Sequence, residues 1–165
     1  MSDFESLKTT TKGTLGEQIV DELLADKGWK IIKPNVQGSH KIDRYITKGN
    51  TTYALDIKAK SKRRLYNDSG FDYEDYCKYM MLAKEHKLRV VILFVDESLG
   101  AIYGGFLDKL IEPYNNYPMV QEDRHDKKQI FFHMKQMKVM RELTPEEIEA
   151  MKELSSEYDS REVVA

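Results

Sequence analysis

The sequence contains few of the residues that build disulfide or zinc frameworks. Cys77 is the only cysteine among 165 residues, and there are four prolines and one tryptophan. A single cysteine excludes an intramolecular disulfide and any zinc site built from several cysteines. The four histidines, His40, His86, His125 and His133, show no spacing typical of a zinc site, so we expect none of them to bind a metal.

The sequence also lacks long apolar runs and a strong excess of charge of one sign. No run approaches the roughly 18 apolar residues that cross a bilayer, and the first residues do not resemble a secretory signal. Lysine and arginine number 26 against 28 acidic residues, which gives a net charge of −2 and no global argument for nucleic acid. Only the segment 58–64 is locally basic, with five cations in seven residues. By itself, this segment is equally well explained as a solvated loop.

Apolar periodicity and turn residues predict a single α/β domain at 13–143, preceded by a loose lead-in at 1–12 and followed by a C-terminal helix and tail at 144–165. We expect a mixed central sheet with the first helix on one side and the second on the other, plus a C-terminal strand and helix. The expected helices are 14–27, 72–87 and 144–154, with one or two helical turns at 106–111; the expected strands are 29–32, 41–47, 52–60, 88–95, 101–103 and 129–134; loops are expected at 35–39, 67–70 and 112–128.

A hairpin between the second and third strands contains the most informative residues. The pair Gly49-Asn50 is typical of a two-residue turn, and counting outward from it places Asp43 directly opposite Asp56. Like charges opposite each other destabilise a sheet. A divalent cation removes this repulsion, because Mg²⁺ is typically held by one or two carboxylates together with water and substrate phosphate oxygens.

Side-chain alternation along the third strand adds a lysine to this pair. Leu55 and Ile57 point towards an apolar core, which sends Asp56 and Lys58 to the opposite face, beside Asp43. A lysine beside a metal-bound water can orient that water, and its charge stabilises a phosphate under attack. Carboxylates and lysine together indicate phosphodiester hydrolysis, although a cross-strand salt bridge would also explain Asp56 and Lys58 alone.

The triplet acid-x-Lys is not specific by itself. The sequence contains it three times, as Asp56-Ile57-Lys58, Glu85-His86-Lys87 and Asp126-Lys127-Lys128. The second lies at the end of a predicted helix and the third in a polar loop, where a solvated face explains both. Only the first lies on a strand with a second aspartate correctly spaced before it.

The order of these residues resembles the αβββαβ core of the PD-(D/E)XK nucleases, which have the restriction-endonuclease-like fold. The resemblance covers about residues 13–96: Gly16-Glu17 on the first helix, Asp43 in the hairpin, Asp56-Ile57-Lys58 on the next strand, then a helix and a buried strand. Ile42 stands where the name of the motif has proline. The resemblance implies that Glu17, Asp43 and Asp56 hold a metal and that Lys58 is the catalytic lysine. For Glu17 alone, a surface glutamate is the alternative.

Further segments resemble a phage- and bacterial-type subgroup of these nucleases. They are Lys62-Arg63-Arg64, the turn Ser69-Gly70-Phe71 and the helix start at 72–76. The subgroup implies a polar residue of this helix at the site, for which Tyr76 is our candidate; a core tyrosine at helical spacing is an equal alternative.

The resemblance also gives the basic segment a role. Lys60, Lys62, Arg63 and Arg64 would bind phosphates flanking the scissile bond. We therefore expect a cytoplasmic enzyme, in the host cytoplasm if phage-encoded, that hydrolyses DNA with Mg²⁺ or Mn²⁺ and has no membrane partner. The alternatives are an inactive nucleic-acid-binding module of the same fold, a junction-resolving endonuclease that acts as a homodimer, and a protein-interaction domain that uses the helix 72–87 or the C-terminal helix.

Overall fold

The computed structural model describes the backbone of residues 3–34 and 42–162 and the side chains of residues 12–34 and 42–155. His40, the expected loop at 35–39 and the first residue of the strand expected at 41–47 lie outside these ranges. In chain order, the elements are α1 (Asp3–Asp26), β1 (Lys30–Ile32), β2 (Arg44–Lys48), β3 (Thr51–Ala59), β4 (Asp68–Asp72), α2 (Tyr73–His86), β5 (Val90–Asp96), β6 (Ala101–Phe106), α3 (Leu107–Leu110), β7 (Met119–Glu122), β8 (Lys128–His133), the 3-10 helix η1 (Met134–Gln136), β9 (Lys138–Glu142) and α4 (Pro145–Glu162).

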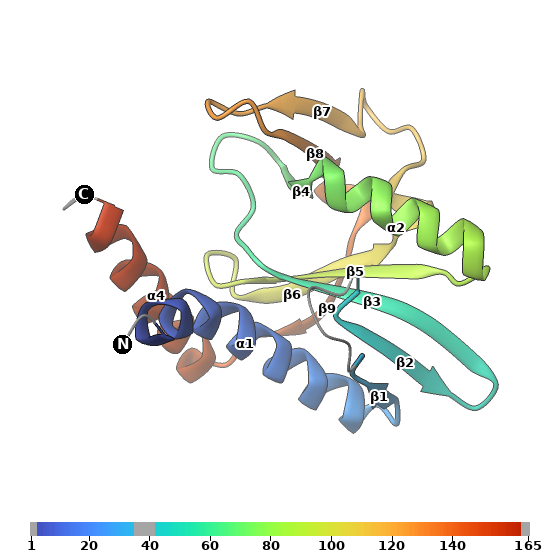
Figure 1. Ribbon diagram of the computed structural model, residues 1–165, viewed down its shortest axis with the longest axis horizontal. Helices are drawn as coiled ribbons and strands as arrows, with labels where there is room; N and C mark the ends of the chain where they lie inside the picture. Colours follow the sequence, from blue (N-terminus) through green and yellow to red (C-terminus); the bar gives the residue numbers. More distant parts are fainter. Residues whose placement is uncertain (1–2, 35–41, 163–165) are drawn as a thin grey trace.

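Six strands form a central mixed sheet in the order β1-β2-β3-β5-β6-β9. The central pair β3 and β5 is parallel, whereas the other neighbouring pairs are antiparallel. Helix α1 covers one face of this sheet and α2 the other, and α4 packs beside α1 (Figure 1). This arrangement confirms the predicted α/β fold with its two helices on opposite sides.

The apolar strand β5 contributes to a core on each face of the sheet. Ile92 and Phe94 belong to the core under α2, whereas Leu93 and Val95 belong to the core under α1. None of these four residues is more than 2% exposed, and each such side chain contributes about 1.5–3 kcal/mol by its burial. Consecutive apolar residues therefore mark a strand buried on both faces, as predicted.

A second, three-stranded sheet of order β4-β8-β7 corrects two expectations. The loop expected at 67–70 is largely strand β4, and the loop expected at 112–128 contains strand β7. At Gly70 a Cβ atom would overlap the carbonyl oxygen of Ile130 on β8. Gly70 therefore allows β4 and β8 to approach each other closely, whereas the sequence predicted a turn at this position.

Both long terminal helices extend further than their apolar periodicity predicts. Helix α1 begins at Asp3, so the loose lead-in expected at 1–12 is wrong from that residue onwards. The segment contains no proline, and once packing fixes the helix further along, each added residue gains a hydrogen bond. Helix α4 continues to Glu162, past the expected end near Leu154. In the part of the chain that the structure describes, no helix is both long and apolar enough to span a membrane.

Candidate active site

The β2–β3 hairpin brings Asp43 and Asp56 together, as predicted. Its pairing runs from Lys48 opposite Thr51 to Arg44 opposite Leu55. Asp43 lies in a bend just before this ladder, and its carboxyl group lies within hydrogen-bonding reach of the Asp56 carboxyl group. Asp43 lies just before β2 and is anchored to β3, because its Oδ2 atom accepts a hydrogen bond of 2.9 Å from the backbone N–H of Ile57.

Asp56 is a buried carboxyl group with an incompletely satisfied oxygen. The residue is only 4% exposed. Burial, together with the nearby Asp43 carboxylate, raises its pKa from 3.8 to about 7, and Lys58 only partly offsets this effect. Lys58 Nζ lies 2.9 Å from Asp56 Oδ2, but no hydrogen bond of acceptable geometry reaches that oxygen from the described residues. The folded protein therefore disfavours the charged form of Asp56 unless a further cation approaches.

Lys58 lies on the same face of β3 and points towards α2. Its ammonium group donates hydrogen bonds of 3.1 Å to Asp75 Oδ2 and of 3.1 Å to the hydroxyl oxygen of Tyr79. Burial lowers the pKa of Lys58, but Asp56 and then Asp75 outweigh this effect, so the pKa is raised overall. Lys58 is therefore a fixed cation and hydrogen-bond donor, and it does not act as a base at neutral pH.

Glu17 reaches the same region because α1 packs unusually closely on the sheet at the preceding residue. A Cβ atom on Gly16 would lie only 3.1 Å from Ala59 Cβ, so glycine allows the helix to approach the end of β3. Burial, followed by the Asp43 carboxylate, raises the pKa of Glu17, while Arg44 lowers it. The edge position expected for Glu17 therefore places it beside Asp43.

Arg44 and Asp21 also belong to this acidic region, and neither was expected there from the sequence. Arg44 Nη2 lies 3.5 Å from Glu17 Oε2, and its Nε lies 3.1 Å from Asp21 Oδ1. A signal was available, because Asp21 follows Glu17 at the i+4 spacing that places two residues on one helix face. Arg44 therefore orients the acidic face of α1 towards the hairpin.

The carboxyl groups of Glu17, Asp43 and Asp56 are the candidates for holding a metal. Within residues 12–34 and 42–155, no group of three or more His, Cys, Asp or Glu side chains is already arranged to hold an ion. A complete protein cage is not required, since Mg²⁺ usually keeps several waters and binds one or two carboxylates plus substrate phosphates. Asp56 Oδ2 is buried, lies beside Asp43 and has an ion pair with Lys58 but no hydrogen bond from the described residues, which fits such a cation.

On α2, the structure brings Tyr79 towards Lys58, whereas Tyr76 is half-buried and packs against the edge of the core. The ring of Tyr76 stacks on Tyr73 with centroids 5.6 Å apart and lies 6.4 Å from Phe132. These contacts are packing contacts of a half-buried ring, so the role of Tyr76 at the site remains a prediction. Tyr79 and Asp75 are residues of α2 that were not expected at the site from the sequence; Tyr79 is three positions after Tyr76 on the same helical face.

The four basic residues after Asp56-Ile57-Lys58 have different surroundings. Arg63 forms a bidentate ion pair with the buried carboxylate of Asp68 and donates to Gln121 Oε1 at 2.6 Å. Lys60 and Lys62 are half-buried, and Arg64 is exposed. Arg63 is therefore engaged within the protein, whereas Arg64 is accessible to a ligand.

The fold and the hairpin geometry define a chain with the restriction-endonuclease-like fold. Among solved structures, it is similar to Hjc of Archaeoglobus fulgidus, a Holliday junction resolvase from an archaeal hyperthermophile, with a TM-score of 0.52 and 12% sequence identity. The similarity covers 74% of this chain and 89% of the resolvase. No protein-family model matches the chain, nor does any curated protein. At this level of identity, the likeness concerns the fold alone.

Proposed function

We propose that the protein is a metal-dependent nuclease that hydrolyses DNA phosphodiester bonds. The observation that carries the proposal is the adjacent pair of carboxyl groups of Asp43 and Asp56, with the charged Lys58 beside Asp56 on the same face of β3. Two carboxylates and one cation in contact are the groups required to hold a divalent ion against a phosphate. The restriction-endonuclease-like fold supports the proposal.

Each side chain has a distinct role in the proposed reaction. Asp43 and Asp56 hold the metal, and Glu17 holds it directly or through water. Bound Mg²⁺ or Mn²⁺ would polarise a phosphate oxygen and supply a water of lowered pKa. Lys58 donates a hydrogen bond that orients the attacking water and stabilises the charge on the phosphate. Tyr79 and Asp75 fix the position of the Lys58 ammonium.

The substrate panel should include branched DNA, because the structural neighbour is named as a Holliday junction resolvase. Labelled duplex, single-stranded, flap and four-way-junction DNA, with RNA for comparison, would be incubated with Mg²⁺, Mn²⁺ or EDTA. Cutting both strands of a junction requires a homodimer. Measurement of the protein's size in solution would show whether a homodimer forms.

The decisive comparison is wild type against Asp56→Asn. Asp126→Asn is a matched control, because Asp126 begins the same acid-x-Lys triplet in an exposed turn, where its φ of 59° suits asparagine. We expect metal-dependent cleavage in wild type and Asp126→Asn and its loss in Asp56→Asn. Equal cleavage by all three proteins would refute the proposed site.

A second candidate function is that of an inactive nucleic-acid-binding module. It is favoured because, among the side chains described, no three potential ligands are already arranged to hold a metal ion. Thermal melting distinguishes the two without an activity assay. At a Mg²⁺ concentration of about ten times its dissociation constant, a true site would raise the wild-type Tm by roughly 3–6 °C, but not that of Asp56→Asn. DNA binding that is unaffected by EDTA, with no cleavage and no Mg²⁺-induced shift, would support the inactive module.

A further inference from the structure

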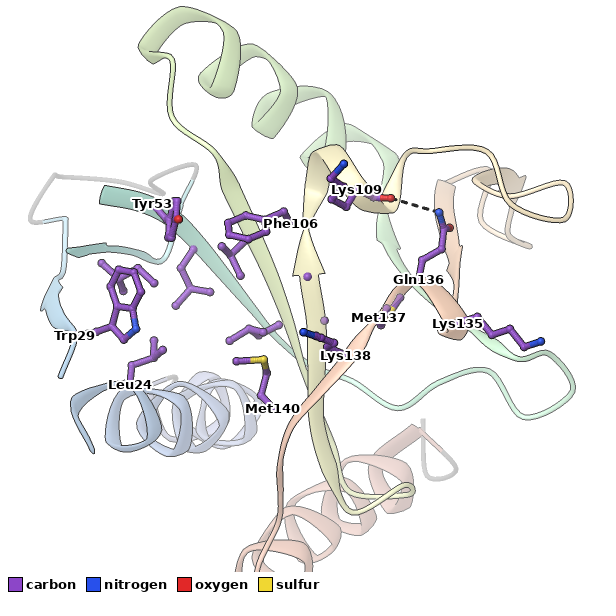
Figure 2. A pocket seen from close by; sticks show the side chains of 16 residues that line it. Leu24, Trp29, Tyr53, Phe106, Lys109, Lys135, Gln136, Met137, Lys138 and Met140 are labelled. Carbon is purple, nitrogen blue, oxygen red and sulfur yellow. Dashed lines mark hydrogen bonds between the residues drawn. The ribbon is translucent and has the colours of Figure 1, made fainter. Parts of the chain in front are cut away.

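A hollow of about 510 Å³ lies over the α1 face of the central sheet, beyond the part that α1 covers. Figure 2 shows Trp29, Tyr53 and Phe106 along one side of it, with Met140 and Lys138 facing them. The hollow is on the opposite face of β3 from Asp56, so it is separate from the candidate active site.

The aromatic side of the hollow is arranged by its own contacts. The rings of Trp29 and Tyr53 are 5.6 Å apart, and those of Tyr53 and Phe106 are 5.0 Å apart with an edge-to-face angle of 74°. Aliphatic side chains of β2, β3 and β5 form the floor. Pockets of about 300–1,000 Å³ with mostly apolar walls are typical of sites for small organic molecules.

The charged residues around the hollow are all of one sign. Three of its 16 lining residues are lysines, and none is aspartate or glutamate, although acidic residues outnumber basic ones 28 to 26 in the whole chain. Lys138 forms no ion pair with any side chain within residues 12–34 and 42–155, and Lys109 pairs only with the exposed Glu112 at 2.9 Å. An occupant with an apolar body and an anionic head would complement both the walls and the rim.

We propose that this hollow binds a small amphipathic anion, with an aliphatic or aromatic body and one carboxylate-like head near Lys138. The apolar body would displace water from the aromatic wall, and the head would remain at the lysine rim. The inference does not depend on the proposed nuclease activity, because it rests on the other face of the sheet.

Trp29 makes the proposal directly measurable, since it is the only tryptophan in the chain. The probe is dodecanoate, with dodecanol as its uncharged counterpart, and the readout is Trp29 emission. We expect a saturable shift of the emission to shorter wavelength with dodecanoate below about 1 mM, and weaker binding of dodecanol.

Two variants and one control test the placement. Lys138→Gln should weaken dodecanoate binding by about threefold, the effect of one exposed ion pair. Met140→Asp should weaken it further by placing a like charge at the hollow, and because Met140 is 36% exposed the fold should be retained, as circular dichroism would verify. Lys84→Gln, on the exposed surface of α2, should bind as wild type does.

Three results would each overturn the proposal: no saturable shift of Trp29 emission, equal binding of dodecanoate and dodecanol, or equal weakening by Lys84→Gln and Lys138→Gln. A groove that accepts only a protein segment would give the first of these results. If the protein binds dodecanoate but does not cleave DNA, the proposed ligand site is supported and the proposed nuclease function is refuted.

Discussion

The hydroxyl oxygen of Tyr79 on α2 lies 3.1 Å from the ammonium nitrogen of Lys58 on β3. Burial, followed by the Asp56 carboxylate, raises the pKa of Tyr79, so the phenol stays protonated at neutral pH. This contact links the second helix to the strand that carries the candidate site. Tyr76, on the same helix, makes no such contact with Lys58 among the described residues; it is half-buried and packs against Phe132.

We expect Tyr79→Phe to lower the cleavage rate by roughly tenfold, because a hydrogen bond to a charged group is worth about 1.5–3 kcal/mol and Asp75 retains part of the alignment. Tyr76→Phe should leave the rate unchanged. The measurement is kcat at saturating DNA for both variants. A larger loss of kcat in Tyr76→Phe than in Tyr79→Phe would show that Tyr76, and not Tyr79, is the residue of α2 that acts at the site.

The raised pKa of Asp56 predicts how stability depends on pH. Between about pH 4 and pH 7 the folded state holds this proton and the unfolded state, with an ordinary pKa of 3.8, does not. The free energy of unfolding therefore falls as the pH rises through this window, by at most about 4 kcal/mol for a shift of this size. Above pH 7 Asp56 is charged in the folded state, so the destabilisation caused by its burial is fully present.

Asp56→Asn should remove this penalty. Without added metal, we expect the variant to be more stable than wild type at pH 8 and to lose that advantage towards pH 4. Urea unfolding at several pH values checks this, with Asp126→Asn as a control that follows wild type. Parallel stability profiles for wild type and Asp56→Asn would show that Asp56 ionises normally.

The neighbouring residues Arg63 and Arg64 should respond oppositely to substitution. Arg63→Ala leaves the fully buried Asp68 without its cation, which typically costs about 3–5 kcal/mol of stability. Arg64→Ala removes an exposed charge, so stability should change by less than about 0.5 kcal/mol while DNA affinity falls. Urea unfolding and a salt titration of DNA binding measure the two effects. A stable Arg63→Ala protein with weakened DNA binding would restore Arg63 as a phosphate ligand.

The close approach at Gly16 predicts a coupled loss of stability and activity. Gly16→Leu should destabilise the protein by about 1–3 kcal/mol, because the new side chain has no space between α1 and β3. Displacing α1 also moves Glu17, so the cleavage rate should fall at temperatures where the variant is folded. Gly13→Leu is the matched control: a Cβ there meets no atom within 4 Å among the described residues, and its stability should equal or exceed wild type. Normal cleavage by folded Gly16→Leu would argue against a role for Glu17.

The local parts of this fold and site follow from the sequence. The turn at Gly49-Asn50 and the alternation of side chains fix the hairpin pairing from Lys48 and Thr51 to Arg44 and Leu55, which brings Asp43 close to Asp56 without any knowledge of the rest of the chain. The apolar run of β5 also identifies the central strand from local sequence, because a nearly continuous apolar run is typical of a strand covered on both faces.

Contacts between distant elements could not be predicted in this way. Whether Tyr76 or Tyr79 contacts Lys58 depends on how α2 is rotated and positioned over the sheet. Helical periodicity places both tyrosines on the same face and does not decide between them. The ion pair of Arg63 with Asp68 depends on a second sheet whose strands contain turn-forming residues. Metal binding by Glu17, Asp43 and Asp56 remains a prediction, supported by their proximity.

The parallel pairing of β3 with β5 also has a consequence for protein synthesis. Parallel neighbours require a crossover, here through β4 and α2, so β5 is made well after β3. A nascent chain that ends at Ala59 already contains Glu17, Asp43, Asp56 and Lys58, but it lacks the neighbouring strand β5, and its lysine lacks both partners on α2. At about 5–20 residues per second, the ribosome needs a few more seconds to supply the missing strand. A chain released early would therefore carry every proposed catalytic side chain without the contacts that hold the Lys58 ammonium in position.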